Sequence, residues 1–244
     1  MHNDDRQVGR VLSRREVIAL LGGAAASMLV GCPGEQSSST PVTETGTPSC
    51  VVRPEQTEGP FFVDEHLNRS DIRPDPSDGS VKQGVLLQLV LRVSRFASNG
   101  CSPLLGANVD IWHCDALGAY SDFSFEGTAG KKFLRGYQVT DANGSVRFTT
   151  IYPGWYPGRT VHIHFKVRTG SASVRSYEFT SQLYFDDSIT DEVHTKEPYA
   201  SRGQRTLRNA QDGIYRAGGN QLMLLLKKAG QGYEATFDIG LQIA

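Results

Sequence analysis

The chain has 244 residues, which is enough for one sizeable hydrophobic core or two small ones. Its 25 Lys and Arg residues balance 26 Asp and Glu residues, and because no basic block occurs, nucleic acid is not expected as a partner. A hydrophobic content of 39% is typical of an ordinary globular domain.

The first 32 residues have the pattern of an export signal. The pair Arg14-Arg15 precedes an apolar run from Ala19 to Val30, which is too short to span a bilayer as a permanent helix. Paired arginines are typical of twin-arginine export, and the run ends in Leu29-Val30-Gly31-Cys32, which resembles a bacterial lipoprotein cleavage box. We therefore expect residues 1–32 to form the signal, with Cys32 lipidated and the protein outside the cytoplasm, anchored to the cell membrane or in the periplasm. The alternative is a simple secretory signal with a chance arginine pair and an unmodified Cys32.

Residues 33–49 consist mostly of Ser, Thr, Pro, Gly and Glu, and are predicted to be a flexible linker before a folded domain at 50–244. The domain holds three cysteines, Cys50, Cys101 and Cys114. Outside the cytoplasm two of them can form a disulfide, and the sequence does not indicate which two. Their wide spacing, without a Cys-x-x-Cys, does not indicate a metal site.

The folded part is rich in short apolar or alternating segments bounded by Gly and Pro, which is typical of an all-β sandwich or barrel. We predict a hairpin where Asn143-Gly144 separates two such segments, because Asn-Gly favours positive φ, and a short helix within 201–214. The predicted strands are 85–93, 108–114, 133–140, 145–151, 161–168, 177–185, 221–226 and 233–243.

The segment His162-Ile163-His164 is the first candidate metal site. Side chains two residues apart on a strand point to the same face, so both imidazoles can bind one metal ion. The neighbours Val161, Ile163 and Phe165 are expected to face an apolar layer on the other side. A His-x-His by itself is also compatible with two ordinary half-buried histidines.

Two tyrosines add to this candidate site. Tyr156 lies in a Gly- and Pro-rich turn six residues before His162, where it can fold back over the strand that follows. Tyr120 follows the predicted strand 108–114. Taken singly, each tyrosine is better explained as a core ring with a hydrogen-bonded hydroxyl.

Taken together, these segments resemble the intradiol ring-cleaving dioxygenases, a family that includes catechol and protocatechuate dioxygenases. The resemblance runs from residue 54 to residue 185, and its segments occur in the order of the family. They are Pro54–Phe62, Gly106–Trp112, Gly118–Tyr120, Thr140–Gly144, Pro153–Pro157, Arg159–Phe165 and Ser181–Phe185.

The resemblance implies a β-sandwich of mostly antiparallel strands with long active-site loops, holding one non-haem Fe(III) ion through Tyr120, Tyr156, His162 and His164. Phenolate is a hard anionic donor, a bound cation can remove the phenol proton, and neutral imidazoles complete the set without adding charge. The implied reaction inserts both atoms of O2 into a catechol-type diol and opens the ring between the hydroxyl-bearing carbons, giving a cis,cis-muconate-type product. The metal acts as a Lewis acid on the substrate, and Tyr156 is the ligand expected to leave when the substrate chelates.

Further residues are assigned by the same resemblance. Arg159 is expected beside the reacting ring, where its permanent charge can stabilise developing negative charge; otherwise it is a surface arginine in a turn. Gln182 is expected near the substrate, or is simply a polar residue on a strand face. The remaining expected contacts are Trp112 beside the metal layer, and Gly59, Pro60 and Phe61 at the mouth of the pocket.

The sequence also departs from the better-known family members. The interval from Tyr156 to His162 is shorter, which predicts a more open pocket, and no long helical N-terminal region like the dimerisation region of catechol dioxygenases is expected. A homo-oligomer is compatible with the chain, but the dimer of the family cannot be carried over to it.

Two other functions fit a His-x-His strand. One is a zinc or cupin-like metalloenzyme, which would need a further ligand such as His194. The other is a non-catalytic, tethered sandwich that binds partners or aromatic ligands, although such a module has no reason to keep four metal ligands. Bound iron and visible colour would distinguish these functions from a dioxygenase.

Overall fold

The computed structural model describes residues 50–97, 100–170 and 177–243. The predicted signal (1–32) and linker (33–49) lie outside the described residues, and so both stay predictions, as does the lipidation of Cys32. None of the helices in the described part of the chain is long and apolar enough to cross a membrane.

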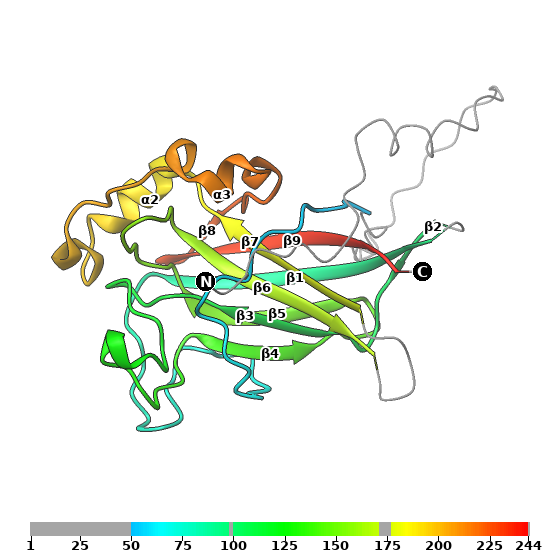
Figure 1. Ribbon diagram of the computed structural model, residues 1–244, viewed down its shortest axis with the longest axis horizontal. Coiled ribbons are helices and arrows are strands. Elements are labelled where there is room, and N and C mark those ends of the chain that lie inside the picture. Colours follow the sequence, from blue (N-terminus) through cyan, green and yellow to red (C-terminus); the bar gives the residue numbers. More distant parts are fainter. Residues whose placement is uncertain (1–49, 98–99, 171–176, 244) are drawn as a thin grey trace, which may run out of the picture. The chain divides into compact units, whose positions relative to one another are not determined.

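Two sheets make up the fold (Figure 1). In the first sheet, β1 (Leu86–Ala97) pairs antiparallel with β2 (Gly100–Pro103) and with β5 (Ser145–Ile151). It also pairs, in parallel, with β9 (Gly232–Gln242). The short strand β8 (Lys227–Ala229) pairs antiparallel with β9. The second sheet is antiparallel throughout. Its strands follow the order β4 (Arg135–Val139), β3 (Asn108–Trp112), β6 (His162–Thr169) and β7 (Tyr177–Tyr184).

Alternation of side chains explains how the sheets pack. Along β1, the residues Leu87, Leu89 and Leu91 are fully buried while their neighbours are more exposed, which places every second side chain in the core. Along β6, Ile163, Phe165 and Val167 turn to the same core. The prediction of an all-β sandwich is therefore confirmed, because the inner faces of two sheets share one apolar layer.

The predicted hairpin at Asn143-Gly144 is wrong. The turn itself forms, because Asp141 Oδ1 accepts the backbone N–H groups of Asn143 and Ser145, each at 2.9 Å. However, β4 pairs with β3 and β5 pairs with β1, so the turn joins the two sheets. The Gly144 carbonyl accepts the N–H of Val93 at 2.7 Å, which directs the chain to β1 and away from β4.

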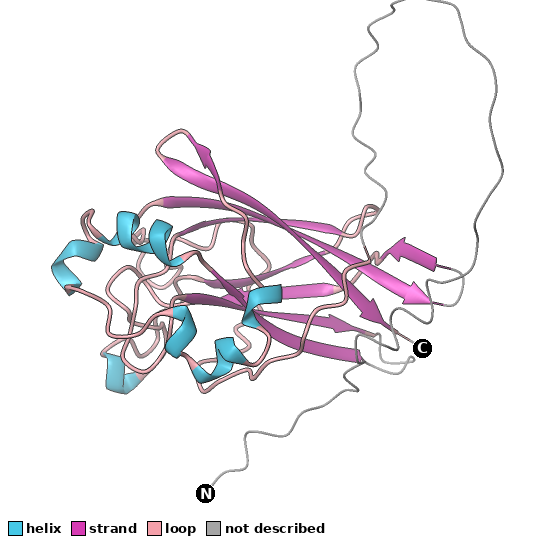
Figure 2. Cartoon of the chain, turned by 90° about the horizontal axis from the view of Figure 1, so that it is seen from above, coloured by secondary structure: helices cyan, strands magenta, loops and turns pink. Residues whose placement is uncertain are grey.

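The helical parts lie together at one end of the strands, on the left in Figure 1, and Figure 2 shows the same grouping from above. The helix predicted within 201–214 is broken into short pieces, and the predicted strand 221–226 contributes only a bridge between Met223 and Tyr184. An eight-residue helix in the acidic segment after β7 was not expected. The helical elements are η1 (Ser124–Glu126), α2 (Asp187–His194), η2 (Tyr199–Arg202), η3 (Asn209–Gln211), α3 (Gly213–Arg216) and η4 (Gly219–Gln221).

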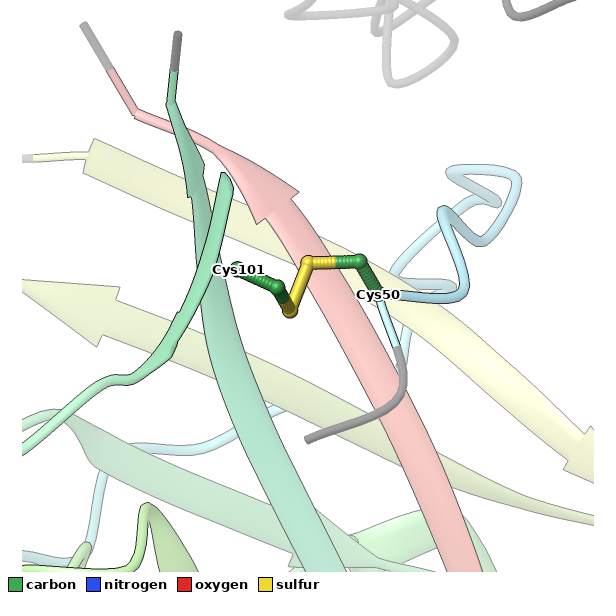
Figure 3. Close-up of a disulfide and its surroundings, with 2 residues drawn as sticks. All are labelled: Cys50 and Cys101. Carbon is green, nitrogen blue, oxygen red and sulfur yellow. A yellow bond between two sulfur atoms is a disulfide. The ribbon is translucent and has the colours of Figure 1, made fainter. Parts of the chain in front are cut away.

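A disulfide joins Cys50 to Cys101 and resolves the pairing that the sequence left open (Figure 3). It ties the first described residue of the domain to β2, and the two cysteines are 51 residues apart in the sequence. Closing a long loop in this way restricts the unfolded chain and stabilises the fold. Cys114 is buried and free.

Candidate active site

The two histidines of β6 point to one face of the four-stranded sheet, as predicted. Both side chains are buried, and the Nε2 atoms of His162 and His164 lie 2.9 Å apart. The opposite face of the strand carries Ile163 and Phe165 into the core. Because side chains alternate between the two faces of a strand, the two Nε2 atoms lie close together on one face of the sheet.

The hydrogen bonding of His162 leaves its Nε2 atom able to bind a metal ion. Its Nδ1–H donates to the carbonyl of Thr160 at 2.6 Å, which leaves the lone pair on Nε2. Burial, with a contribution from the positive charge of Arg159, holds the pKa of His162 well below its ordinary value. Burial also lowers the pKa of His164. Both imidazoles are therefore neutral at physiological pH, which is the form that binds a metal.

Two loops bring the tyrosines to the histidines. The Tyr156 hydroxyl lies 3.3 Å from Nε2 of His162, and the rings of Tyr120 and Tyr156 meet edge to face at 5.6 Å. The loops touch through glycines. A Cβ at Gly118 would lie 2.2 Å from the Trp155 carbonyl oxygen, and one at Gly154 would lie 2.4 Å from the carbonyl oxygen of Ala116. Only glycine permits this backbone approach.

The tyrosine hydroxyls fit a bound cation. Tyr120 is fully buried, and its hydroxyl has no hydrogen-bond partner among the described residues. An unsatisfied buried hydroxyl costs about 1–3 kcal/mol, which a metal bond would remove. Burial raises the pKa of Tyr156 to about 12 and that of Tyr120 well above its usual range. Without a cation both phenols would therefore keep their protons, whereas a bound metal ion can remove them.

One row of cross-strand neighbours supports the histidines. His164 on β6 is paired with Trp112 on β3 and with Gln182 on β7, and Trp112 is paired in turn with Arg135 on β4. The Trp112 and His164 rings are stacked, with centroids 4.9 Å apart and an angle of 8° between the planes. The structure thus places Trp112 against His164, one of the candidate metal ligands.

Arg159 lies at the site and is not a free surface arginine. Its Nη1 is 3.4 Å from Nε2 of His162, and its Nη2 donates to Gln182 Oε1 at 2.6 Å. Its Nε donates to Asp212 Oδ2 at 2.8 Å, and only 16% of the side chain is exposed. The guanidinium is therefore held next to His162 by Asp212 and Gln182.

Both the oxygen and the nitrogen of the Gln182 side-chain amide form hydrogen bonds with protein groups. Its Oε1 accepts from Arg159 and from the Tyr184 hydroxyl (3.0 Å), and its Nε2 donates to the Thr57 carbonyl at 2.9 Å. The structure thus gives Gln182 a role in holding Arg159, in addition to the substrate contact that the resemblance implies. The contact to Thr57 also fixes the segment that leads to Gly59.

The segment around Gly59 passes over the site from the N-terminal side. A Cβ at Gly59 would meet His164 Cε1 at 3.4 Å, and Pro60 is exposed. The Phe61 ring stacks on Tyr120 with centroids 4.0 Å apart and planes 3° apart, and it meets Tyr156 edge-on at 5.8 Å. All three residues expected at the pocket mouth therefore lie on one segment that borders both tyrosines.

Several supporting residues were not predicted from the sequence. Asp212 anchors Arg159, Tyr184 bonds to Gln182 and Gln56, and Arg135 donates to the carbonyls of Ser121 and Phe61. The sequence contains only a weak signal for Asp212, which is an Asp directly before a short helix. No local signal links Tyr184 to Gln56 or Arg135 to Phe61, because these partners are distant in the sequence.

The structure also gives other roles to the remaining histidines near the fold core. His194 lies on α2, hydrogen-bonds through Nε2 to the Pro153 carbonyl at 3.1 Å and stacks on Tyr199. Both ring nitrogens of His113 are hydrogen-bonded, to the Cys114 carbonyl and to Thr150. Within residues 50–97, 100–170 and 177–243, no three or more His, Cys, Asp or Glu side chains are grouped to hold a metal ion. Without the tyrosines, His162 and His164 therefore lack the further ligands that a zinc or cupin site needs.

Comparisons with known proteins point to one family. A family profile described as "Dioxygenase" matches residues 57–242. Catechol 1,2-dioxygenase 1 of Acinetobacter lwoffii is 28% identical over 170 residues, which cover 59% of this chain and 50% of that protein. The chain thus spans about half the length of this curated relative.

Two of the similar solved structures match over nearly their whole length. An intradiol ring-cleavage dioxygenase from Tetranychus urticae is 32% identical, with a TM-score of 0.68 over 79% of this chain and 95% of that one. The dioxygenase domain of a carbohydrate-binding fusion protein from Streptomyces sp. SirexAA-E is 33% identical, with a TM-score of 0.57 over 80% and 100% of the two chains. The chain belongs to the intradiol ring-cleavage dioxygenase family.

Proposed function

We propose that the protein is a non-haem Fe(III) dioxygenase that inserts both atoms of O2 into a catechol-type diol and opens the ring between the two hydroxyl-bearing carbons. The product is a cis,cis-muconate-type diacid. The observation that carries the proposal is the convergence of four donors, His162 and His164 Nε2 with the hydroxyls of Tyr120 and Tyr156, in a chain of this family. A zinc enzyme or a binding module would leave this donor set without a use.

The residues of the candidate active site would have different roles in the reaction. Tyr120, Tyr156, His162 and His164 would hold the ferric ion, which supplies Lewis acidity toward a chelated catecholate. Tyr156, on its Gly- and Pro-rich turn, would leave on substrate binding, and its Oη would take a proton from a catechol hydroxyl. Arg159 would stabilise the negative charge that develops on the ring oxygens. Phe61 and Trp112 keep the surroundings of the donors apolar.

The first prediction concerns the metal. The purified protein is expected to contain about one iron ion per chain and to be coloured by phenolate-to-iron charge transfer, because the proposed ligand set includes two tyrosines. Metal analysis and a visible spectrum test this. An oxygen-uptake screen over catechol, hydroxyquinol, protocatechuate and chlorinated catechols then tests the reaction. A colourless protein with stoichiometric zinc would exclude the proposed function.

We also propose that the protein acts outside the cytoplasm, anchored through a lipidated Cys32. The sequence pattern of residues 1–32 is supported by the Cys50–Cys101 disulfide, since such bonds persist mainly in oxidising compartments. A Cys32→Ala variant is expected to move from the membrane fraction to the soluble extracytoplasmic fraction. A Cys114→Ala variant is the matched control, because Cys114 is buried in the domain. Membrane association that persists in Cys32→Ala would contradict lipid anchoring.

A further inference from the structure

Asp212 carries a buried carboxylate that the reaction above does not use. Its side chain is 1% exposed, and it lies at the start of α3, 53 residues after Arg159. One oxygen, Oδ1, accepts the N–H groups of Ile214 and Tyr215 at 2.8 and 3.0 Å. The other, Oδ2, accepts Arg159 Nε and the N–H of Thr160, both at 2.8 Å. The carboxylate thus links the short helix to the residues directly before His162.

The neighbouring contacts make this link rigid. Thr160 Oγ1 donates to Asn209 Oδ1 at 2.6 Å, and Asn209 Nδ2 donates to the Phe185 carbonyl at 2.8 Å. With Asp212 on one side and Gln182 on the other, the Arg159 guanidinium is held through both Nε and Nη2. Nη1 is the group that remains, and it points toward His162 Nε2 at 3.4 Å.

We propose that Asp212 is the positioning residue for Arg159, fixing the guanidinium so that Nη1 faces the ring-cleavage site. The inference rests on the proposed function above. A carboxylate is needed because all four groups around Asp212 are hydrogen-bond donors, which two acceptor oxygens can satisfy. An amide at this position could cap α3 with its oxygen, but its NH2 group would then face Arg159 Nε–H and Thr160 N–H. Asp212→Asn should therefore keep the helix cap and release Arg159.

The test is a double-mutant cycle on turnover of catechol by the iron-loaded protein. Asp212→Asn is expected to lower kcat by roughly 10- to 100-fold, because small misplacement of a charge at the reacting centre has effects of this size. In an Arg159→Ala background, the same substitution should lower kcat no further. An equal loss in both backgrounds would mean that Asp212 acts on the fold alone, and no loss in the parent background would also overturn the proposal.

Asp186→Asn is the matched control. Asp186 caps α2 in the same way, accepting the N–H groups of Ser188 and Ile189 with Oδ1, and it has no contact with Arg159 in the structure. This variant should leave kcat unchanged, and melting temperatures of all variants will separate losses of stability from losses of rate.

A second measurement does not depend on turnover. In the iron-free protein, the side-chain Nε–H of Arg159 should give a protected NMR signal, assigned by its loss in Arg159→Ala. Asp212→Asn should shift this signal and speed its hydrogen exchange, whereas Asp186→Asn should not. An unchanged signal would overturn the positioning role. If the signal responds but the parent oxidises no catechol, the proposed function fails and the catalytic role of Asp212 with it, while the Asp212–Arg159 contact stands.

Discussion

A Tyr120→Phe variant is expected to lose iron affinity by on the order of 100-fold or more, together with most of its charge-transfer colour, since even partners behind the metal ligands typically contribute 10- to 100-fold. Tyr120 is fully buried beneath the stacked Phe61 ring, and its hydroxyl has no other partner among the described residues. No neighbour or solvent can therefore replace the missing phenolate.

Tyr156→Phe is expected to behave differently. Tyr156 is partly exposed on a Gly- and Pro-rich turn, which suits a ligand that must leave. The variant should keep part of its iron and colour through Tyr120 but turn over poorly, because it lacks the Oη that takes a catechol proton. Iron content, visible spectrum and oxygen uptake measure all three properties.

Tyr152→Phe is the matched control for both substitutions. Its ring is also fully buried, but its hydroxyl is bonded to Thr190, away from the four donors. Removing that hydroxyl should lower stability and leave iron content unchanged. If Tyr156→Phe left both the substrate-free spectrum and the activity untouched, Tyr156 would not be a ligand and the assignment of its loop would have to be abandoned.

Arg159→Ala is expected to retain iron and colour while losing on the order of 10²–10³ in kcat, which is the usual effect of removing one preorganised stabilising group. The guanidinium lies 3.4 Å from His162 Nε2 without being a metal ligand, because it has no lone pair to offer. The variant should therefore have a lower kcat and an unchanged visible spectrum.

The control for this variant is Arg92→Ala. Arg92 also pairs with a carboxylate through Nε, at 2.7 Å from Asp238, but it lies on β1 in the other sheet. Steady-state kinetics and iron analysis of both variants are compared. Loss of iron in Arg159→Ala at normal stability would show that Arg159 holds the metal centre together and does not act on the substrate.

The sequence by itself determined the local features of this protein. Strand alternation was sufficient to predict the all-β fold and to put His162 and His164 on one face, because side chains two residues apart on a strand always share a face. The turn at Asp141–Gly144 was likewise encoded locally, since Asp141 bonds to residues two and four positions ahead.

Only the tertiary structure decided which of these local pieces meet. The Asn143-Gly144 turn could not reveal that β4 and β5 belong to different sheets, because that choice depends on pairing with β3 and β1, more than twenty residues away. The disulfide partner of Cys50 and the partner of Arg159 are 51 and 53 residues distant for the same reason. Hydrogen bonds and packing between such distant residues leave no periodic pattern in the sequence. The role of Asp212 could therefore be inferred only from the folded chain, in which its carboxylate contacts Arg159.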